Sequence, residues 1–186
     1  MARKLREEVA GGVFHVFARG NDKRVIFLDD LDRGRYLQTL RSTVEERLWR
    51  LLAYCLMDNH VHLLVETPKP NLGDGMRWLH GTYAGGFNKR HGRSGHVFQG
   101  RYGAQRIKTD AQLSAVTAYI AMNPVEAGLC DLPEEWPWSS HSLVVAGRAP
   151  DWMDIPHLLA YFEAAGGDGR RTYAELVHRG TDPVEG

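Results

Sequence analysis

The sequence of 186 residues has few cysteines and no long hydrophobic run. Its two cysteines, Cys55 and Cys130, are far apart and form no Cys-x-x-Cys pair, which excludes a disulfide-rich scaffold and a cysteine-rich zinc site. No apolar stretch approaches the roughly 20 residues needed to cross a bilayer. Residues 1–8 lack the apolar centre of a signal peptide. We therefore expect a soluble protein of the reducing cytoplasm, without a membrane partner.

The net charge is zero, but the charges are unevenly distributed along the chain. Residues 69–123 carry eight basic and two acidic side chains, whereas residues 124–186 carry four basic and eleven acidic ones. A basic segment can bind a polyanion, because the phosphates that it neutralises release counterions. It can equally be a solvated surface, so charge alone leaves nucleic-acid binding open.

The hydrophobic pattern predicts alternating strands and helices. Runs of β-branched and aromatic residues indicate strands, and apolar residues three and four positions apart indicate helices. The predicted strands cover 13–19, 51–57, 60–65 and 102–108; the predicted helices begin at 30, cover 72–91, and run from 109 to about 122. The first six elements have the β-α-β-β-α-β order of a ferredoxin-like split β-α-β fold, an α+β class with an antiparallel sheet.

Two of these helices contain residues that oppose helix formation. Five glycines lie within 72–91, each costing about 1 kcal/mol, and Asn123 precedes Pro124, which disfavours helical backbone. The chain is divided into a domain over 1–141 and a C-terminal extension over 142–186. Three tryptophans are expected to pack back onto the domain: Trp136, Trp138 and Trp152.

A pair of histidines, His60 and His62, lies in the predicted third strand. Side chains at i and i+2 of a strand point to the same face, about 6.6 Å apart for a rise of about 3.3 Å per residue. Two imidazoles at this spacing can share one cation, with Val61 on the opposite, buried face. An isolated His-x-His pair is more often simply polar and exposed, so the pattern alone does not decide.

The third predicted helix carries Tyr119 and Asn123. Residues four positions apart are neighbours on one face of a helix, so the phenol can stand beside the amide. A separate apolar stripe can supply the contacts with the core, which leaves Tyr119 free for chemistry. A surface tyrosine that packs against the C-terminal extension is an equally open interpretation.

Residues 91–108 form a basic, glycine-rich segment. Glycines let the backbone approach a ligand closely, arginines fork onto phosphates, and aromatic rings such as Phe98 or Tyr102 can stack on bases. A solvated loop at a sheet edge is the alternative. Lys4 and Arg6 are possible additions from an N-terminal arm. The candidate DNA-binding residues are Lys89, Arg90, Arg93, Arg101, Arg106 and Lys108.

Three segments together resemble the Y1 tyrosine transposases of the HUH single-strand endonuclease superfamily, which are IS200-like. They are residues 54–64 (Tyr-Cys-Leu-Met-Asp-Asn-His-Val-His-Leu-Leu), residues 95–102 and residues 118–125. They occur in the family's order and at fitting distances. Residues 136–141 (Trp-Pro-Trp-Ser-Ser-His) are more similar to the domesticated branch, the REP-associated tyrosine transposases, than to the shorter insertion-sequence enzymes.

This resemblance implies roles for individual residues. His60 and His62 match the paired histidines that bind a divalent metal, Tyr119 matches the nucleophile, and Asn123 matches the third ligand, a side-chain amide. Nitrogen and oxygen ligands of this kind suit Mg²⁺ or Mn²⁺. One departure is that Asn123 precedes Pro124, so its amide could cap the helix instead.

We therefore predict a metal-dependent single-strand DNA endonuclease and strand transferase that acts next to a DNA hairpin through a 5′-phosphotyrosine intermediate. The alternative is a non-catalytic regulator that binds DNA hairpins on the same fold. A small hydrolase that uses the histidines without the tyrosine is less favoured, because no carboxylate is placed to act as a base. Insertion-sequence relatives are dimers that exchange tyrosine helices, whereas domesticated relatives tend to be monomers; we favour a monomer, with a dimer as the alternative.

Overall fold

The structure is a computed structural model of the chain and describes residues 9–163 and 167–179. Its strands are β1 (Gly12–Arg19), β2 (Arg50–Leu56), β3 (His60–Thr67) and β4 (Gly103–Ile107). Its longer helices are α1 (Asp30–Arg47), α2 (Leu72–Arg90) and α3 (Asp110–Glu126). The shorter ones are α4 (His141–Val145), α5 (Ile155–Ala160) and α6 (Gly169–His178), with 3₁₀ turns η1 (Asn21–Lys23) and η2 (Pro133–Glu135).

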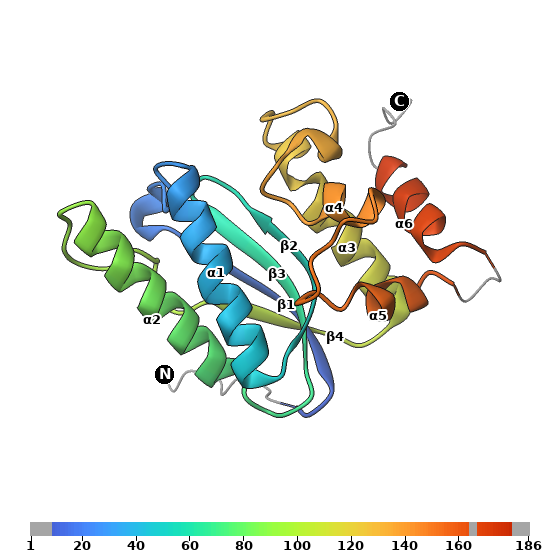
Figure 1. Cartoon of the computed structure of the whole chain (residues 1–186), viewed down its shortest axis with the longest axis horizontal. Coiled ribbons are helices and arrows are strands. Elements are labelled where there is room, and N and C mark those ends of the chain that lie inside the picture. Colours follow the sequence, from blue (N-terminus) through green and yellow to red (C-terminus); the bar gives the residue numbers. More distant parts are fainter. Residues whose placement is uncertain (1–8, 164–166, 180–186) are drawn as a thin grey trace.

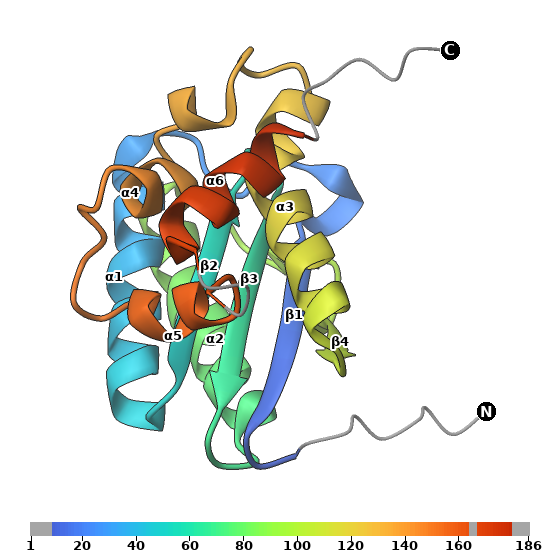
Figure 2. The same cartoon turned by 90° about the vertical axis from the view of Figure 1, so that its right-hand side faces the viewer.

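The four strands form one sheet in the order β2-β3-β1-β4, with every neighbouring pair antiparallel. This is the split β-α-β arrangement, so the predicted ferredoxin-like α+β fold is confirmed. Helices α1 and α2 cover one face of the sheet, while α3 to α6 lie on the other (Figure 1). Figure 2 shows α3, α5 and α6 in front of the sheet, with α1 behind it. The strands begin and end within two residues of the predicted bounds.

The alternation along β3 sorts its side chains between the two faces. Val61 and Leu63 are completely buried in the hydrophobic core. His60 and His62 alternate with them, and the strand register places them opposite Arg19 and Phe17 of β1. Because residues opposite each other in a sheet share a face, the two histidines lie with these β1 side chains on the α3 side.

Helix α2 is continuous despite its five glycines. The apolar residues that predicted it are all buried, and this packing outweighs the weak intrinsic propensity. Gly75 is required by the packing, because a Cβ there would lie 2.2 Å from a ring carbon of Trp49. The buried apolar residues of the helix are Leu72, Met76, Leu79, Tyr83 and Phe87.

Helix α3 begins as predicted but ends later. The Thr109 side chain caps it by accepting a hydrogen bond from the backbone N–H of Gln112 at 3.2 Å. The helix then runs through Pro124 to Glu126, instead of ending near residue 122. The proline removes one N–H donor, and the turn closes again because the N–H of Ala127 donates to the Asn123 carbonyl at 3.0 Å. Asn123 is therefore inside the helix.

The segments after α3 pack against the sheet and α3. Trp136 donates from Nε1 to the Leu56 carbonyl at 3.1 Å, and Trp152 stacks on Tyr54 with the ring centroids 6.2 Å apart. All three tryptophans that the sequence analysis singled out contact the core. The division into 1–141 and 142–186 stays a prediction. Among the described residues, no helix has the length and apolar character needed to span a bilayer.

Candidate active site

The fold brings together the four side chains that the sequence analysis proposed for chemistry. His60 Nε2 lies 3.1 Å from Asn123 Oδ1. The rings of His60 and His62 are perpendicular, with centroids 5.0 Å apart, and the Tyr119 ring is 5.4 Å from that of His62. Strand β3 therefore supplies two imidazoles, and α3 supplies the phenol and the amide, within one chain.

The two residues from α3 differ in exposure. Tyr119 is 43% exposed, whereas Asn123, one turn later on the same face, is 7% exposed. The phenol can therefore reach a macromolecule at the surface, while the amide is enclosed beside the histidines. We expect this difference in exposure between a nucleophile, here Tyr119, and a buried metal ligand, here Asn123.

The hydrogen bonds around His60 are incomplete when its ring is neutral. Its Nδ1 lies 2.7 Å from Asn59 Oδ1, and the Asn59 amide is oriented by donating from Nδ2 to the Lys23 carbonyl at 3.0 Å. A neutral imidazole has one N–H, so it cannot donate to both Asn59 and Asn123. Burial lowers the pKa of His60, which disfavours the doubly protonated ring. With the proton on Nδ1, two acceptor atoms face each other, Nε2 of His60 and Oδ1 of Asn123.

His62 has one satisfied nitrogen and one that lacks a partner. Its Nδ1 lies 2.9 Å from Nε2 of a third histidine, His15 of β1. Its Nε2 is buried and has no hydrogen-bond partner among the described residues. Burial lowers the pKa of His62 to about 3, with smaller contributions from its two histidine neighbours. The ring is therefore neutral at physiological pH, and a buried lone pair or N–H is left unused.

These features fit a divalent cation held by two imidazoles and an amide oxygen. A cation would supply the partner that the His60–Asn123 contact lacks, and it would use the orphaned Nε2 of His62. No cluster of three or more His, Cys, Asp or Glu side chains within residues 9–163 and 167–179 is arranged to hold a metal. The ligand set that the geometry offers is two histidines and one asparagine.

Three side chains of β1 that share this face were not among the residues predicted from the sequence. His15, Phe17 and Arg19 alternate along the strand, and their partners on β3 include both site histidines. Phe17 is 43% exposed, and its ring lies 6.4 Å from that of His62. Gly103 of β4 makes room for this ring, because a Cβ there would lie 2.3 Å from it. Only their i, i+2, i+4 spacing could have indicated them, since it matches that of the histidine pair.

The candidate DNA-binding residues do not all lie on the face of the sheet that carries the site. Arg106 lies in register with the buried Phe14, so it is on the face of the sheet that α1 and α2 cover. The strand register thus turns it away from His15 and Tyr119. The exposed candidates on or beyond α2 and β4 are Lys89, Arg93, Arg101 and Lys108. Lys4 and Arg6 lie outside the described residues.

Arg90, the remaining candidate, is engaged by two carboxylates. Its guanidinium contacts Asp29 at 2.6 Å and Asp32 at 2.5 Å, which joins the end of α2 to the start of α1. The hydrogen bond from Arg90 is the main reason that the pKa of Asp29 falls to about 2. The structure therefore gives Arg90 a structural contact, and its role toward DNA stays a prediction.

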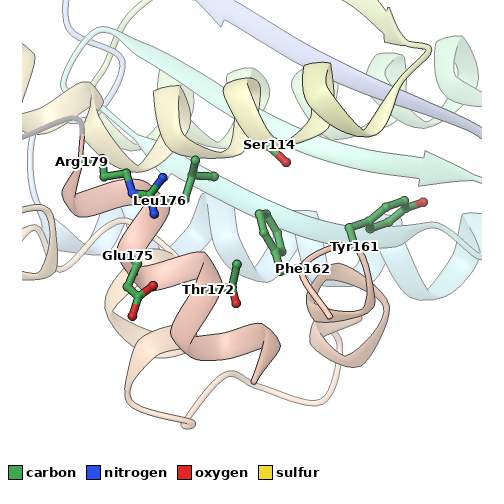
Figure 3. Close-up of a pocket in the computed structure, with 7 residues that line it drawn as sticks. All are labelled: Ser114, Tyr161, Phe162, Thr172, Glu175, Leu176 and Arg179. Atoms are coloured by element: carbon green, nitrogen blue, oxygen red, sulfur yellow. The ribbon is translucent and has the colours of Figure 1, made fainter. Parts of the chain in front are cut away.

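A cavity of about 380 Å³ lies elsewhere, between α3, α6 and the segment after α5 (Figure 3). Ser114, Tyr161 and Thr172 are among its lining residues, which include none of the four predicted site residues. The accessible side chains beside the histidines are Tyr119 and Phe17, each 43% exposed.

Comparison with known proteins defines the class of this protein as a transposase. A family model described as "Transposase IS200 like" matches residues 8–123. This match covers more than half of the chain, so the protein belongs to the IS200-like transposase family, and the predicted resemblance to the Y1 tyrosine transposases is confirmed.

Two known proteins are similar to this chain over most of its length. A Haemophilus influenzae protein described as a REP-associated tyrosine transposase is 26% identical over 171 residues, covering 85% of this chain and 97% of the relative. A solved REP-associated tyrosine transposase bound to a REP hairpin has a TM-score of 0.67 and 21% identity, covering 83% of this chain and 93% of the other. The structural match supports the fold described above.

Proposed function

We propose that this protein is a metal-dependent single-strand DNA endonuclease and strand transferase that acts next to a DNA hairpin, with Tyr119 as its nucleophile. The observation that carries the proposal is the convergence of an accessible phenol, two neutral imidazoles and an amide in one chain. Membership of a transposase family supports the same reaction class.

The reaction is an exchange of one phosphate ester for another. Tyr119 Oη attacks the phosphorus in line, its proton passes to solvent, and the bond to the 3′-oxygen breaks. The 3′-oxygen takes up a proton and leaves as a free 3′-OH, while the 5′ end stays attached as a phosphotyrosine. Because the ester bond is conserved, a 3′-OH can reverse the step and join strands without a nucleoside triphosphate.

The phenol needs help to perform this attack. A free phenol has a pKa of about 10 and is a weak nucleophile at neutral pH. His60, His62 and Asn123 would hold the divalent cation, Mg²⁺ or Mn²⁺. When bound, such an ion polarises a non-bridging phosphate oxygen and offsets charge in the transition state. All three ligands are uncharged, so the full charge of the ion remains available to the phosphate.

The proposed partner is a REP-like hairpin with an adjacent single strand. The relative with the same fold is described as bound to such a hairpin. Phe17 offers an exposed ring beside His62 on which a base can stack, and Arg19 adds an exposed cation opposite His60. The site is complete within one chain, which supports a monomer that acts alone.

Covalent capture of a labelled oligonucleotide tests the proposal. A hairpin with a 3′-labelled single strand should form a Mg²⁺-dependent adduct that survives a denaturing gel. Tyr119→Phe removes only the hydroxyl, so it should abolish the adduct while hairpin binding stays unchanged in a mobility-shift assay. An adduct formed by the Phe variant would disprove the assignment of the nucleophile. Binding by the unaltered protein without any adduct would favour the non-catalytic regulator.

A further inference from the structure

His15 makes a buried contact with His62 that has no part in the chemistry proposed above. Its Nε2 lies 2.9 Å from Nδ1 of His62, and the two rings are nearly parallel, with an interplanar angle of 24° and centroids 5.2 Å apart. The two residues are 7% and 6% exposed. They are 47 positions apart in the chain and meet because β1 pairs with β3.

The contact can be made in two ways, which differ in what they leave at Nε2 of His62. The two nitrogens are 2.9 Å apart, and a neutral imidazole has a single N–H, so one ring donates and the other accepts. If His15 donates, the proton of His62 sits on Nε2, as a buried donor without a partner among the described residues. If His62 donates from Nδ1, its Nε2 holds a lone pair that a cation can use.

We infer that His15 is a positioning residue: it accepts a hydrogen bond from Nδ1–H of His62 and holds that ring with the Nε2 lone pair ready for a divalent cation. The inference rests on the proposed function. It matches the contact on the other side of the site, where Asn59 is placed to accept from Nδ1 of His60 at 2.7 Å. Metal-binding histidines generally donate their second N–H in this way.

A neutral acceptor at this place has a chemical consequence. A carboxylate in the position of His15 would add a negative charge beside the cation and weaken its attraction for a phosphate. Two neutral partners, an imidazole and an amide, orient the ligands without adding charge. The arrangement therefore suits a site whose substrate is an anion.

The first test reads the tautomer of His62 directly in the metal-free protein. In ¹⁵N-histidine-labelled protein, long-range ¹⁵N–¹H correlation shows which nitrogen of each ring carries the proton. We expect His62 to be protonated at Nδ1, and His15→Leu to move the proton to Nε2 or to a mixture of the two. A His62 ring protonated at Nε2 in the unaltered protein, or a tautomer that His15→Leu leaves unchanged, would overturn the inference.

The second test measures Mn²⁺ affinity without DNA, from the loss of the free-ion signal in electron paramagnetic resonance. His15→Leu should weaken binding by about 10- to 100-fold, and His15→Gln, whose amide oxygen can accept, should restore part of it. The matched control is His80→Leu. This change removes another histidine of lowered pKa, which stacks on Phe98 at 4.1 Å, and it should leave the affinity unchanged.

The outcomes separate this inference from the function on which it rests. Equal affinities for His15→Leu and the unaltered protein, with affinity lost in His62→Ala, would overturn the role of His15 alone. Unchanged affinity in His62→Ala as well would overturn the metal site itself. A role of His15 in packing alone predicts no rescue by glutamine and no change of tautomer.

Discussion

The two faces of the sheet differ in how completely their side chains find packing and hydrogen-bond partners within the protein. On the α1 and α2 face, Val61 and Leu63 are fully enclosed by other apolar groups. On the α3 face, the adjacent His60 and His62 are neutral, partly or fully buried, and short of hydrogen-bond partners. Burial of apolar surface on the first face stabilises the fold. The second face can then hold polar groups in an arrangement that only a ligand completes.

The largest effect on activity is expected from changes on the α3 face, which carries His60 and His62. Replacing both His60 and His62 by alanine should lower cleavage by orders of magnitude, because it removes both imidazole ligands and with them the charge stabilisation of the phosphate. The measurement is the rate of adduct formation at saturating Mg²⁺, with circular dichroism to verify the fold. A double variant that cleaves at the original rate would contradict the assignment of His60 and His62 to the active site.

The contrasting change on the apolar face is Leu63→Ala. This residue is next to His62 but fully buried on the other side of the sheet, so its truncation should cost about 2–5 kcal/mol of stability through the cavity that it leaves. Denaturant unfolding measures the loss. At a temperature where the variant is folded, its Mn²⁺ affinity should equal that of the unaltered protein. A large loss of affinity would mean that the two faces are not separable.

A smaller effect is expected at Phe17. Phe17→Leu keeps an apolar side chain over Gly103 but removes the stacking surface, so binding of the single strand beside the hairpin should weaken by about 1–3 kcal/mol. Phe17→Tyr is the control and should bind like the unaltered protein. Titration with a strand that contains a fluorescent base analogue measures both. If the Leu variant binds the strand as tightly as the unaltered protein does, Phe17 is not part of the DNA interface.

The change with the smallest effect at neutral pH is at His80, and it concerns the pH dependence of stability on the α2 side of the sheet. Burial lowers the pKa of His80 from 6.5 to about 3, so the unfolded state binds a proton there before the folded state does. The stability from this group is full above pH 6.5 and is lost as pH falls from 6.5 toward 3. His80→Leu should flatten this part of the curve of unfolding free energy against pH. A curve with the same slope would show that His80 does not contribute.

The sequence predicted the apolar face and the local motifs well, because both depend on regular spacing. The alternation around His60 and His62 and the four-residue step from Tyr119 to Asn123 place each pair on one face wherever the element lies. The family resemblance then linked the two pairs. Only the structure shows that the two pairs lie together, with His60 Nε2 3.1 Å from Asn123 Oδ1.

What the sequence could not provide was the register between paired strands. His15 reaches His62 through the register of β1 against β3, and no local pattern specifies that register. The continuation of α3 through Pro124 was also missed. Asn123 and Pro124 are buried against the rest of the protein, and this packing overrides the local preference for a helix end.

The most direct test of the central claim is to find where DNA becomes attached. The protein is incubated with Mg²⁺ and a hairpin that carries a single-stranded flank, digested, and analysed by mass spectrometry. We expect a nucleotide phosphate on the peptide that contains Tyr119. It should be absent when the metal is chelated and absent in the variant that lacks both His60 and His62. Attachment to another residue, or attachment to Tyr119 at the same rate without metal, would contradict the central claim.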